Sequence, residues 1–360
     1  MRALLVVNPA ATTTSARTRD VLAHALASDL KLDVAETQYR GHARDLARQA
    51  AESGETELVV ALGGDGTVNE VVNGLLTHGP DPEALPRLAV VPGGSTNVFA
   101  RALGLPNDVV ESTGALLAAL HDGSERTIGL GLASGTPGTE DEGVPSRWFT
   151  FCAGFGFDAG VVGRVEQQRG RGKRSTHGLY MRQVLRQFLG ESNRRHGTIT
   201  LERPAEPGAG DDAASGPASE ATADGPGPTA PDSDAAPGSE TAVESRTENL
   251  VMAIIGNTAP WTYLGNRPLY PSPKASFDTA LDLFALSRLS APAVTRYGTQ
   301  LLTSTPERGP HGKHVISLHD LTDFTLHSEA PLPFQMDGDH LGVRTSVTFT
   351  GVRRALRVIV

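Results

Sequence analysis

The sequence predicts an α/β domain with a parallel sheet, followed by a domain of antiparallel β structure. Through residues 1–125, short apolar runs alternate with amphipathic segments of helical length. Strands that alternate with helices in this way form right-handed βαβ units and a parallel sheet. Beyond Arg126 the chain changes to many short strand-like runs with few helical segments, which is typical of antiparallel β structure.

The periodicity of the first domain defines its elements. The expected strands cover 3–7, 31–37, 57–62 and 87–91. The expected helices cover 16–27, 43–52, 67–77 and 107–120. In the helix at 67–77, apolar residues recur at the spacing of one helical face: Val68, Val71, Val72, Leu75 and Leu76.

We place the two domains at 1–128 and 129–360, with the C-terminal residues returning to pack on the first domain. The second domain is expected to carry helices near 179–189 and 291–302. Within it, the segment 203–248 is rich in Pro, Gly, Ala and Ser, and its part from 203 to 245 holds nine acidic residues and one basic residue. Such a segment cannot bury enough apolar surface to fold, so we expect a disordered surface insertion.

The composition favours a cytoplasmic protein. A chain of 360 residues is long enough for two ordinary domains. The apolar run near the N-terminus is too short for a signal peptide, and no run reaches the length of a transmembrane helix. The single cysteine, Cys152, excludes an internal disulfide and a cysteine-based zinc site.

The stretch "LVVALGGDGTVNE" (58–70) joins a buried strand to a helix through a loop that contains three glycines. Residues without a Cβ let the backbone approach a ligand closely, and the free N–H groups of a helix N-terminus favour an anion. A phosphate group is the ligand that fits this loop. The alternative is a tight strand–helix turn in which Asp65 and Thr67 serve only as helix caps.

Two further loops of similar character follow expected strands, "NPAAT" (8–12) and "PGGSTNVFAR" (92–101). The carboxyl ends of parallel strands lie at one edge of a sheet, where ligands bind, so the three loops should line one crevice that faces the second domain. No P-loop motif and no G-x-S-x-G elbow occurs. Gly154, Gly156 and Gly160 match a dinucleotide-binding motif only loosely, and a turn at the domain junction, with Asp158 facing the cleft, is the better interpretation.

Together, "GGDGTVNEVVNGLL", "PGGSTNVFARALGLP", "GFGFDAGVV" and the late "QMDGD" resemble the diacylglycerol kinase catalytic-domain family, which includes sphingosine and ceramide kinases and bacterial lipid kinases. The resemblance extends over the whole chain apart from the insertion. It implies an α/β nucleotide-binding domain with a phosphofructokinase-like parallel sheet, an antiparallel β-sandwich domain that binds the lipid substrate, and ATP and Mg²⁺ in the cleft between them. Formation of a homodimer by this chain is left open by the resemblance.

The resemblance also assigns site residues in this sequence. The nucleotide-binding positions are Asn8, Pro9, Ala10, Ala11, Thr12, Thr37, Gly63, Gly64, Asp65, Gly66, Thr67, Asn69, Glu70, Gly94, Ser95, Thr96 and Asn97. The late motif is Asp337, Gly338 and Asp339, with aspartate where the family usually has glutamate. An Asp-Gly metal loop of some bacterial relatives corresponds to "SFDTALDL", where Asp278 remains a candidate ligand but Thr279 replaces the glycine.

Phosphoryl transfer to an alcohol needs a positioned triphosphate, Mg²⁺ and a carboxylate that takes the hydroxyl proton. We assign Asp65 to Mg²⁺ and nucleotide organisation, Asp337 to the general base, and Asp339 to a partner that orients it or links it to the metal. The alternative for the late motif is a plain hairpin turn. An aspartate that only shapes a turn should tolerate Asn, which also suits turns, whereas a general base should not.

A basic stretch between 164 and 195 carries nine Arg and Lys residues and two acidic residues, and it predicts contact with an anionic membrane surface. The alternative is that this stretch forms a helix face exposed to water and has no membrane partner. Nucleic acid is a poor partner, because the stretch has few interleaved aromatic residues. We therefore expect a cytoplasmic lipid kinase that acts transiently at the inner face of the membrane. Its rivals are a soluble-substrate kinase of the NAD kinase type and a non-catalytic nucleotide- or lipid-binding regulator.

Overall fold

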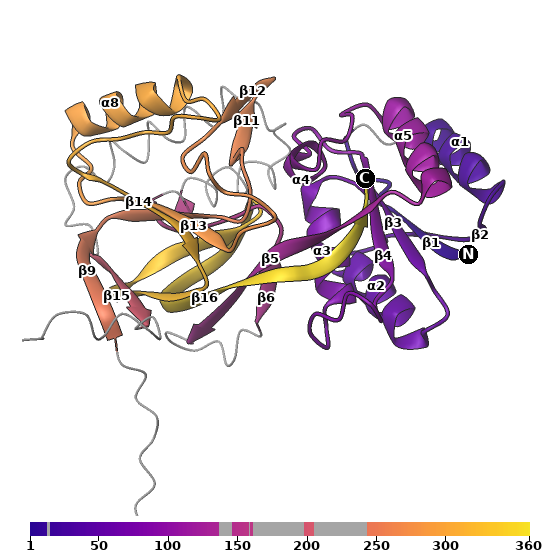
Figure 1. Cartoon of the computed structure of the whole chain (residues 1–360), viewed down its shortest axis with the longest axis horizontal. Helices are drawn as coiled ribbons and strands as arrows, with labels where there is room; N and C mark the ends of the chain where they lie inside the picture. The colour runs from indigo at the N-terminus through magenta and orange to yellow at the C-terminus, as the bar shows by residue number, and fades with distance from the viewer. Residues whose placement is uncertain (13–14, 137–145, 158, 161–197, 205–242) are drawn as a thin grey trace, which may run out of the picture.

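Figure 1 shows the computed structural model of the chain. The structure describes residues 1–12, 15–136, 146–157, 159–160, 198–204 and 243–360. The helix expected at 179–189, the basic stretch at 164–195, Asp158 and most of the acidic insertion lie outside the described residues. No helix among the described residues is long and apolar enough to cross a bilayer.

The α/β half is built on four parallel strands in the order β4-β3-β1-β2. They are β1 (Arg2–Val7), β2 (Lys31–Glu36), β3 (Leu58–Gly63) and β4 (Arg87–Pro92). The four main helices are α1 (Ala16–Ala27), α2 (His42–Ser53), α3 (Asp65–Leu75) and α5 (Val109–Asp122). Helices α1 and α5 pack on one face of the sheet and α2 and α3 on the other, so β3 is buried along its whole length (Figure 1).

The second half is an antiparallel sandwich of two layers. The first layer contains β6 (Arg147–Phe149), β5 (Glu125–Thr136), β16 (Asp339–Ile359), β15 (Asp323–Met336), β8 (Ile199–Pro204) and β9 (Val243–Leu250). The second contains β7 (Cys152–Gly156), β10 (Met252–Gly256), β13 (Leu281–Leu286) and β14 (Val315–Leu321). Strand β15 belongs to both layers, because its first part pairs with β8 and its last residues pair with β7.

Aromatic rings fill the space between the two layers. Phe149, Phe324 and Phe349 come from the first layer, and Phe155 comes from the second. Phe334 lies near the end of β15, where that strand joins the second layer, and its ring meets Phe155 and Phe349 edge to face. Helix α8 (Ala291–Leu302) packs on the other side of the second layer. The antiparallel sandwich expected for the second half of the chain is confirmed, as is the parallel α/β fold of the first half.

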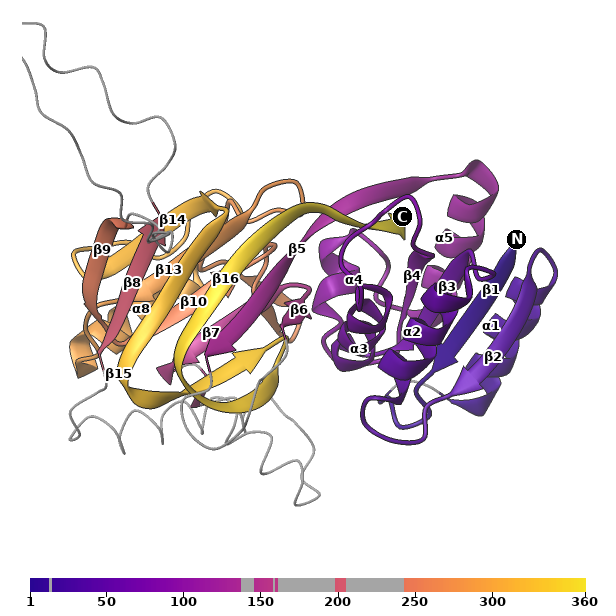
Figure 2. The ribbon, with the colours of Figure 1, turned by 90° about the horizontal axis from the view of Figure 1, so that it is seen from below.

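Strand β16 links the two halves. It runs from the antiparallel half to the α/β half, where Val358 pairs in parallel with Leu88 of β4 (Figures 1 and 2). Strand β5 pairs antiparallel with β16 and spans the expected domain boundary at 128/129. The two halves are therefore joined by paired strands, and the boundary itself stays a prediction.

Three local expectations were wrong. The helix expected to begin at 67 begins at Asp65, because the glycine-rich turn completes its chain reversal at Gly64. A short helix, α4 (Val98–Ala102), begins inside "PGGSTNVFAR" (92–101), which was expected to be loop. Residues 203–204 and 243–248, expected to be part of the disordered insertion, extend β8 and β9, because the two strands pair with each other across this point.

Candidate functional site

The three glycine- and hydroxyl-rich loops meet in one cleft at the carboxyl ends of the parallel strands. The cleft has a volume of about 730 Å³, within the range of ligand pockets. Most of the residues expected to bind nucleotide line it: Asn8, Ala10, Ala11, Thr12, Thr37, Gly64, Asp65, Gly66, Thr67, Glu70, Gly94, Ser95 and Thr96. Asp337, Gly338 and Asp339 line it from the other half of the molecule. Pro9, Gly63, Asn69 and Asn97 lie next to this lining rather than in it.

The backbones of two of these loops touch, and this contact requires glycine on both sides. A Cβ on Gly94 would lie 2.7 Å from Cα of Gly64, and a Cβ on Gly64 would lie 3.2 Å from Cα of Gly94. The Gly93 N–H donates to the Gly63 carbonyl at 2.7 Å, which extends the β3–β4 pairing into the loops. The glycines therefore let the two loops close together at the floor of the cleft, where α3 begins.

Polar side chains fix the positions of the loops. Asn8 Nδ2 donates to Thr67 Oγ1 at 2.9 Å, which joins the first loop to α3. Asn97 adopts a left-handed conformation with φ of 50° and accepts a hydrogen bond from the Gly94 N–H at 2.9 Å. The Glu70 carboxylate accepts from the Gly41 N–H at 2.9 Å. Asn8, Asn97 and Glu70 thus hold the loops that line the cleft in place.

Asp65 lies in the first turn of α3 but caps a different helix. Its Oδ1 accepts a hydrogen bond from the Phe99 N–H of α4 at 3.1 Å. Burial raises the pKa of Asp65 to about 6, although the backbone N–H groups of Val98, Phe99 and Asn97 act to lower it. A carboxylate in this position is charged at neutral pH and can act on a cation or a phosphate in the cleft.

Asp337 is held by an unusually complete set of donors. Its Oδ2 accepts from Asn69 Nδ2 at 2.7 Å and from the N–H and Oγ1 of Thr150 at 2.7 and 2.8 Å. Its Oδ1 accepts from the N–H groups of Phe151 and Cys152 at 3.0 and 3.1 Å. Burial raises the pKa of Asp337 above its usual value, and these N–H groups act against that shift. The carboxylate therefore anchors the β15–β16 turn to both the start of β7 and helix α3.

Asp339 is the more accessible acid of the late motif. Its side chain is 29% exposed, and its Oδ2 lies 3.3 Å from both Arg40 and Arg147. Arg147 also donates to Asn69 Oδ1 at 2.7 Å, so Asp339 and Asp337 are linked through one arginine and one asparagine. Both ion pairs of Asp339 use Oδ2, and the residue lines the cleft.

Asp278, the other expected metal ligand, lies away from this group. Its exposed carboxylate accepts a hydrogen bond from Arg126 at 2.6 Å, and this contact holds the pKa of Asp278 below its usual value. Among the described residues, no three His, Cys, Asp or Glu side chains cluster closely enough to hold a metal ion by themselves. Mg²⁺ at nucleotide sites is usually held by one or two carboxylates together with phosphate oxygens and water, and Asp65 fits that requirement.

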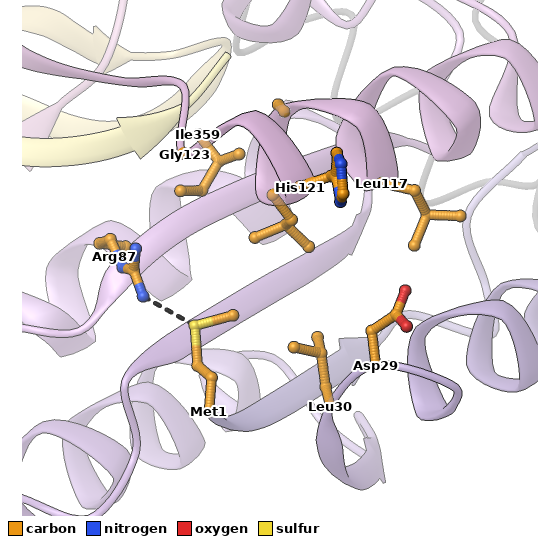
Figure 3. A pocket seen from close by; sticks show the side chains of 10 residues that line it. Met1, Asp29, Leu30, Arg87, Leu117, His121, Gly123 and Ile359 are labelled. Atoms are coloured by element: carbon orange, nitrogen blue, oxygen red, sulfur yellow. Dashed lines mark hydrogen bonds between the residues drawn. The ribbon is translucent and has the colours of Figure 1, made fainter.

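A second pocket of about 510 Å³ lies at the opposite edge of the parallel sheet (Figure 3). It is lined by residues at or near the amino ends of the strands, among them Met1, Leu30 and Arg87, and by His121 at the end of α5. It contains no glycine-rich loop and none of the expected site residues. Ligands of parallel sheets bind at the carboxyl ends of the strands, so the first cleft is the candidate site.

The sequence interpretation missed three groups of site residues. Arg40 and Arg147 hold Asp339, Thr150 holds Asp337, and the hairpin residues Trp261 and Tyr263 line the cleft wall. Thr150 and Asp337 are 187 positions apart, and no local pattern marks either contact. Arg147, the basic residue just before "WFTF" (148–151), was the one feature of the sequence that could have pointed to these contacts.

The contact between the two loops gives a direct test of the cleft floor. We expect Gly94→Ala to weaken ATP binding at least about tenfold, roughly 1.4 kcal/mol, because the new Cβ would push Gly64 and Asn97 aside. Titration calorimetry with ATP measures this change. Gly114→Ala in α5 is the matched control, since its Cβ meets nothing within 4 Å and alanine favours helix. Equal ATP affinity in the two variants would show that this floor does not contact the nucleotide.

Comparison with known proteins confirms the resemblance that the motifs suggested. Residues 2–133 match the family model of the diacylglycerol kinase catalytic domain. A diacylglycerol kinase of Bacillus subtilis is 41% identical over 100 residues, which are 28% of this chain and 30% of that protein. A probable YegS-like lipid kinase of Chromohalobacter salexigens is 44% identical over 103 residues, 26% of this chain and 31% of that protein. The matches span less than a third of these relatives' length.

The fold similarity extends further than the sequence similarity. The structure of a putative diacylglycerol kinase from Bacillus anthracis superimposes with a TM-score of 0.65 at 20% sequence identity, covering 99% of this chain and 96% of that chain. At this identity the comparison establishes the fold. It shows that both the α/β half and the antiparallel half have counterparts in that structure.

Proposed function

We propose, from the membership of residues 2–133 in the diacylglycerol kinase catalytic-domain family, that the chain is an ATP-dependent kinase that phosphorylates the hydroxyl of a lipid alcohol such as diacylglycerol. One observation carries the proposal. Asn69, which follows the "GGDGT" loop, donates to Asp337 of the late "DGD" motif at 2.7 Å, although the two residues are 268 positions apart. This contact joins a phosphate-binding loop to the acids that phosphoryl transfer requires.

The nucleotide-binding role rests on the floor of the cleft. Backbone N–H groups at the start of α3, and the hydroxyls of Thr12, Thr37, Ser95 and Thr96 around them, provide donors for a triphosphate. Asp65 would hold Mg²⁺ that arrives with the nucleotide, and the ion would neutralise charge on the transferred phosphoryl group. Asp65 lines the cleft together with these loops, which supports this role.

The contacts suggest different roles for Asp337 and Asp339, the two aspartates of the late motif. The sequence favoured Asp337 as general base with Asp339 as its partner, but Asp337 is buried and already accepts five hydrogen bonds, whereas Asp339 is more exposed and lines the cleft. We therefore assign proton acceptance to Asp339 and anchoring of the turn to Asp337. Arg40 and Arg147 would hold the Asp339 carboxylate in place.

Asp339→Asn should lower kcat by at least about 100-fold while ATP affinity stays close to that of the wild type. General base catalysis contributes at least that much, and an amide cannot take the hydroxyl proton. Steady-state kinetics and ATP titration of the purified variant measure both quantities. Asp33→Asn is the control, because Asp33 is an exposed carboxylate of β2 that also pairs with an arginine, Arg2. A near-normal kcat in Asp339→Asn would remove Asp339 from the chemistry.

The proposed function is tested by offering the purified protein labelled ATP and a panel of acceptors. Diacylglycerol, sphingosine, ceramide and NAD represent the lipid alcohols and the soluble alternative. We expect label in a lipid and none in NAD. Label in NAD alone would favour a soluble-substrate kinase, and nucleotide binding with no transfer to any acceptor would favour a regulator. Because the acceptor is a lipid, we also propose that the enzyme works at an anionic membrane surface.

A further inference from the structure

The hairpin of β11 (Thr262–Leu264) and β12 (Arg267–Leu269) is the feature of the cleft that the nucleotide does not explain. It forms a small sheet of its own, apart from the large one. Trp261, Tyr263, Leu264 and Leu269 line the cleft from this hairpin. They give the cleft a wall of aromatic and aliphatic side chains, whereas the loops of the α/β half give it hydroxyls and backbone N–H groups.

The hairpin is firmly held in this position. The guanidinium of Arg101, in α4, stacks on the Tyr263 ring at 3.3 Å from the ring centroid. Trp261 packs against the apolar cluster that includes Tyr297 of α8. The Tyr270 N–H donates to Ser304 Oγ at 2.9 Å, just beyond α8. Figure 1 shows the hairpin between α8 and α4, which is the position these contacts require.

The hairpin also lies close to the reacting groups. Tyr263 lines the same cleft as Asp65, Asp337 and Asp339. A substrate seated against Tyr263 and Leu264 would therefore have its polar end near the acids and its apolar part along the hairpin. Phe151, whose backbone N–H donates to Asp337, adds a further apolar side chain to the lining of the cleft.

The chain segment that includes the hairpin carries basic residues and no acidic ones. Residues 261–274 contain two basic residues, Arg267 and Lys274, and no acidic residue, in a chain whose net charge is −9. Both side chains are exposed. Exposed cations on this segment are compatible with an anionic bilayer, from which a lipid acceptor must come.

We propose that the β11–β12 hairpin is the binding surface for the apolar chains of the acceptor lipid, with Tyr263 and Leu264 in contact with the chain segments next to the reacting hydroxyl. The inference rests on the proposed function, because it uses the lipid acceptor as its ligand. The Arg101–Tyr263 stack fixes the distance between this surface and the phosphate loops. The hairpin would thus select an amphiphilic alcohol over a soluble one.

A binding measurement without ATP tests the proposal independently of activity. The chain has two tryptophans, of which Trp148 is buried and Trp261 lines the cleft. Diacylglycerol with dibrominated acyl chains, presented in detergent micelles, should quench the emission of Trp261. The quenching should disappear in Trp261→Phe, which keeps Trp148. An absence of quenching in the wild type would overturn the proposal.

A kinetic measurement uses Leu264→Ala, with Val343→Ala as the control at an exposed apolar side chain outside the cleft. We expect Leu264→Ala to raise the KM for diacylglycerol about tenfold, with the Kd for ATP unchanged, and Val343→Ala to change neither. An unchanged lipid KM in an active Leu264→Ala enzyme would overturn the hairpin site and leave the lipid kinase intact. If the wild type phosphorylates no lipid, the proposed function fails, and the quenching measurement alone then decides whether the hairpin binds acyl chains.

Discussion

Asp337→Asn should destabilise the protein by about 3 kcal/mol or more, although asparagine is nearly the same size. The Asp337 carboxylate accepts hydrogen bonds from three backbone N–H groups, from Thr150 Oγ1 and from Asn69. An amide would turn its own NH₂ group toward some of these donors and leave them unsatisfied in a buried site. A buried donor without a partner costs about 1–3 kcal/mol, and hydrogen bonds to a charged group are worth about 1.5–3 kcal/mol each.

Urea unfolding of the wild type, Asp337→Asn and Asp323→Asn measures this effect. Asp323 is the control, because it accepts one hydrogen bond from Thr350 Oγ1 on the exposed surface. We expect a large loss of stability only in Asp337→Asn, and a loss of transfer along with it. Equal stability of the two variants would show that the donor set around Asp337 does not hold the turn.

This expectation revises the reasoning available from the sequence. From the sequence alone, an Asp337→Asn variant that stayed active would indicate a turn residue, and an inactive one would indicate a general base. In the structure, an anchor that accepts five hydrogen bonds is as intolerant of Asn as a base is. The kcat of Asp337→Asn is therefore informative only when it is normalised to the folded fraction.

Asp65→Asn should abolish transfer and leave the fold at least as stable as that of the wild type. Asparagine can still accept the hydrogen bond from Phe99 through its amide oxygen, so the cap on α4 is retained. It cannot supply the negative charge that Mg²⁺ requires. Because burial raises the pKa of Asp65 to about 6, the charged form is disfavoured in the folded protein. That cost is fully present above about pH 6 and is relieved as the pH falls toward the ordinary range of an aspartate, so a neutral residue removes it at pH 7.

The same pKa gives a pH dependence. Mg²⁺ binding by the nucleotide-free wild type should weaken as the pH is lowered through about 6, because a proton then competes with the ion for the Asp65 carboxylate. Thermal unfolding at pH 7 should give Asp65→Asn a melting temperature equal to or above that of the wild type. A clearly lower melting temperature would mean that Asp65 acts through structure, and the loss of activity would then have a different cause.

The sequence could predict the cleft floor because parallel strands end at a common edge. The loops after 3–7, 57–62 and 87–91 had to meet, and the glycines at 64 and 94 marked where two of them touch. The partners of the acids had no such signal. Arg147 reaches Asp339 and Thr150 reaches Asp337 only because β6 and β7 pass beside the β15–β16 turn, and those positions depend on the packing of the whole sandwich.

Asp278 and α4 are two further cases in which a contact between residues distant in sequence left no local signal. Asp278 was considered as a metal ligand through a motif that lacks its glycine, but Arg126 on β5 lies close enough to pair with it. Helix α4 is too short to give a periodic signal, and it forms where Asp65, 34 positions earlier, can accept from its first N–H groups. In both cases a residue distant in sequence decides the local structure.

The proposed transfer of a phosphoryl group from ATP to a lipid alcohol is tested most directly by single-turnover transfer from γ-labelled ATP to diacylglycerol in mixed micelles. Wild-type and Asp65→Asn protein are compared under conditions in which both are fully folded. We expect labelled phospholipid from the wild type and none above background from the variant. Equal transfer by both proteins, or no labelled lipid from a wild type that binds ATP, would contradict the account.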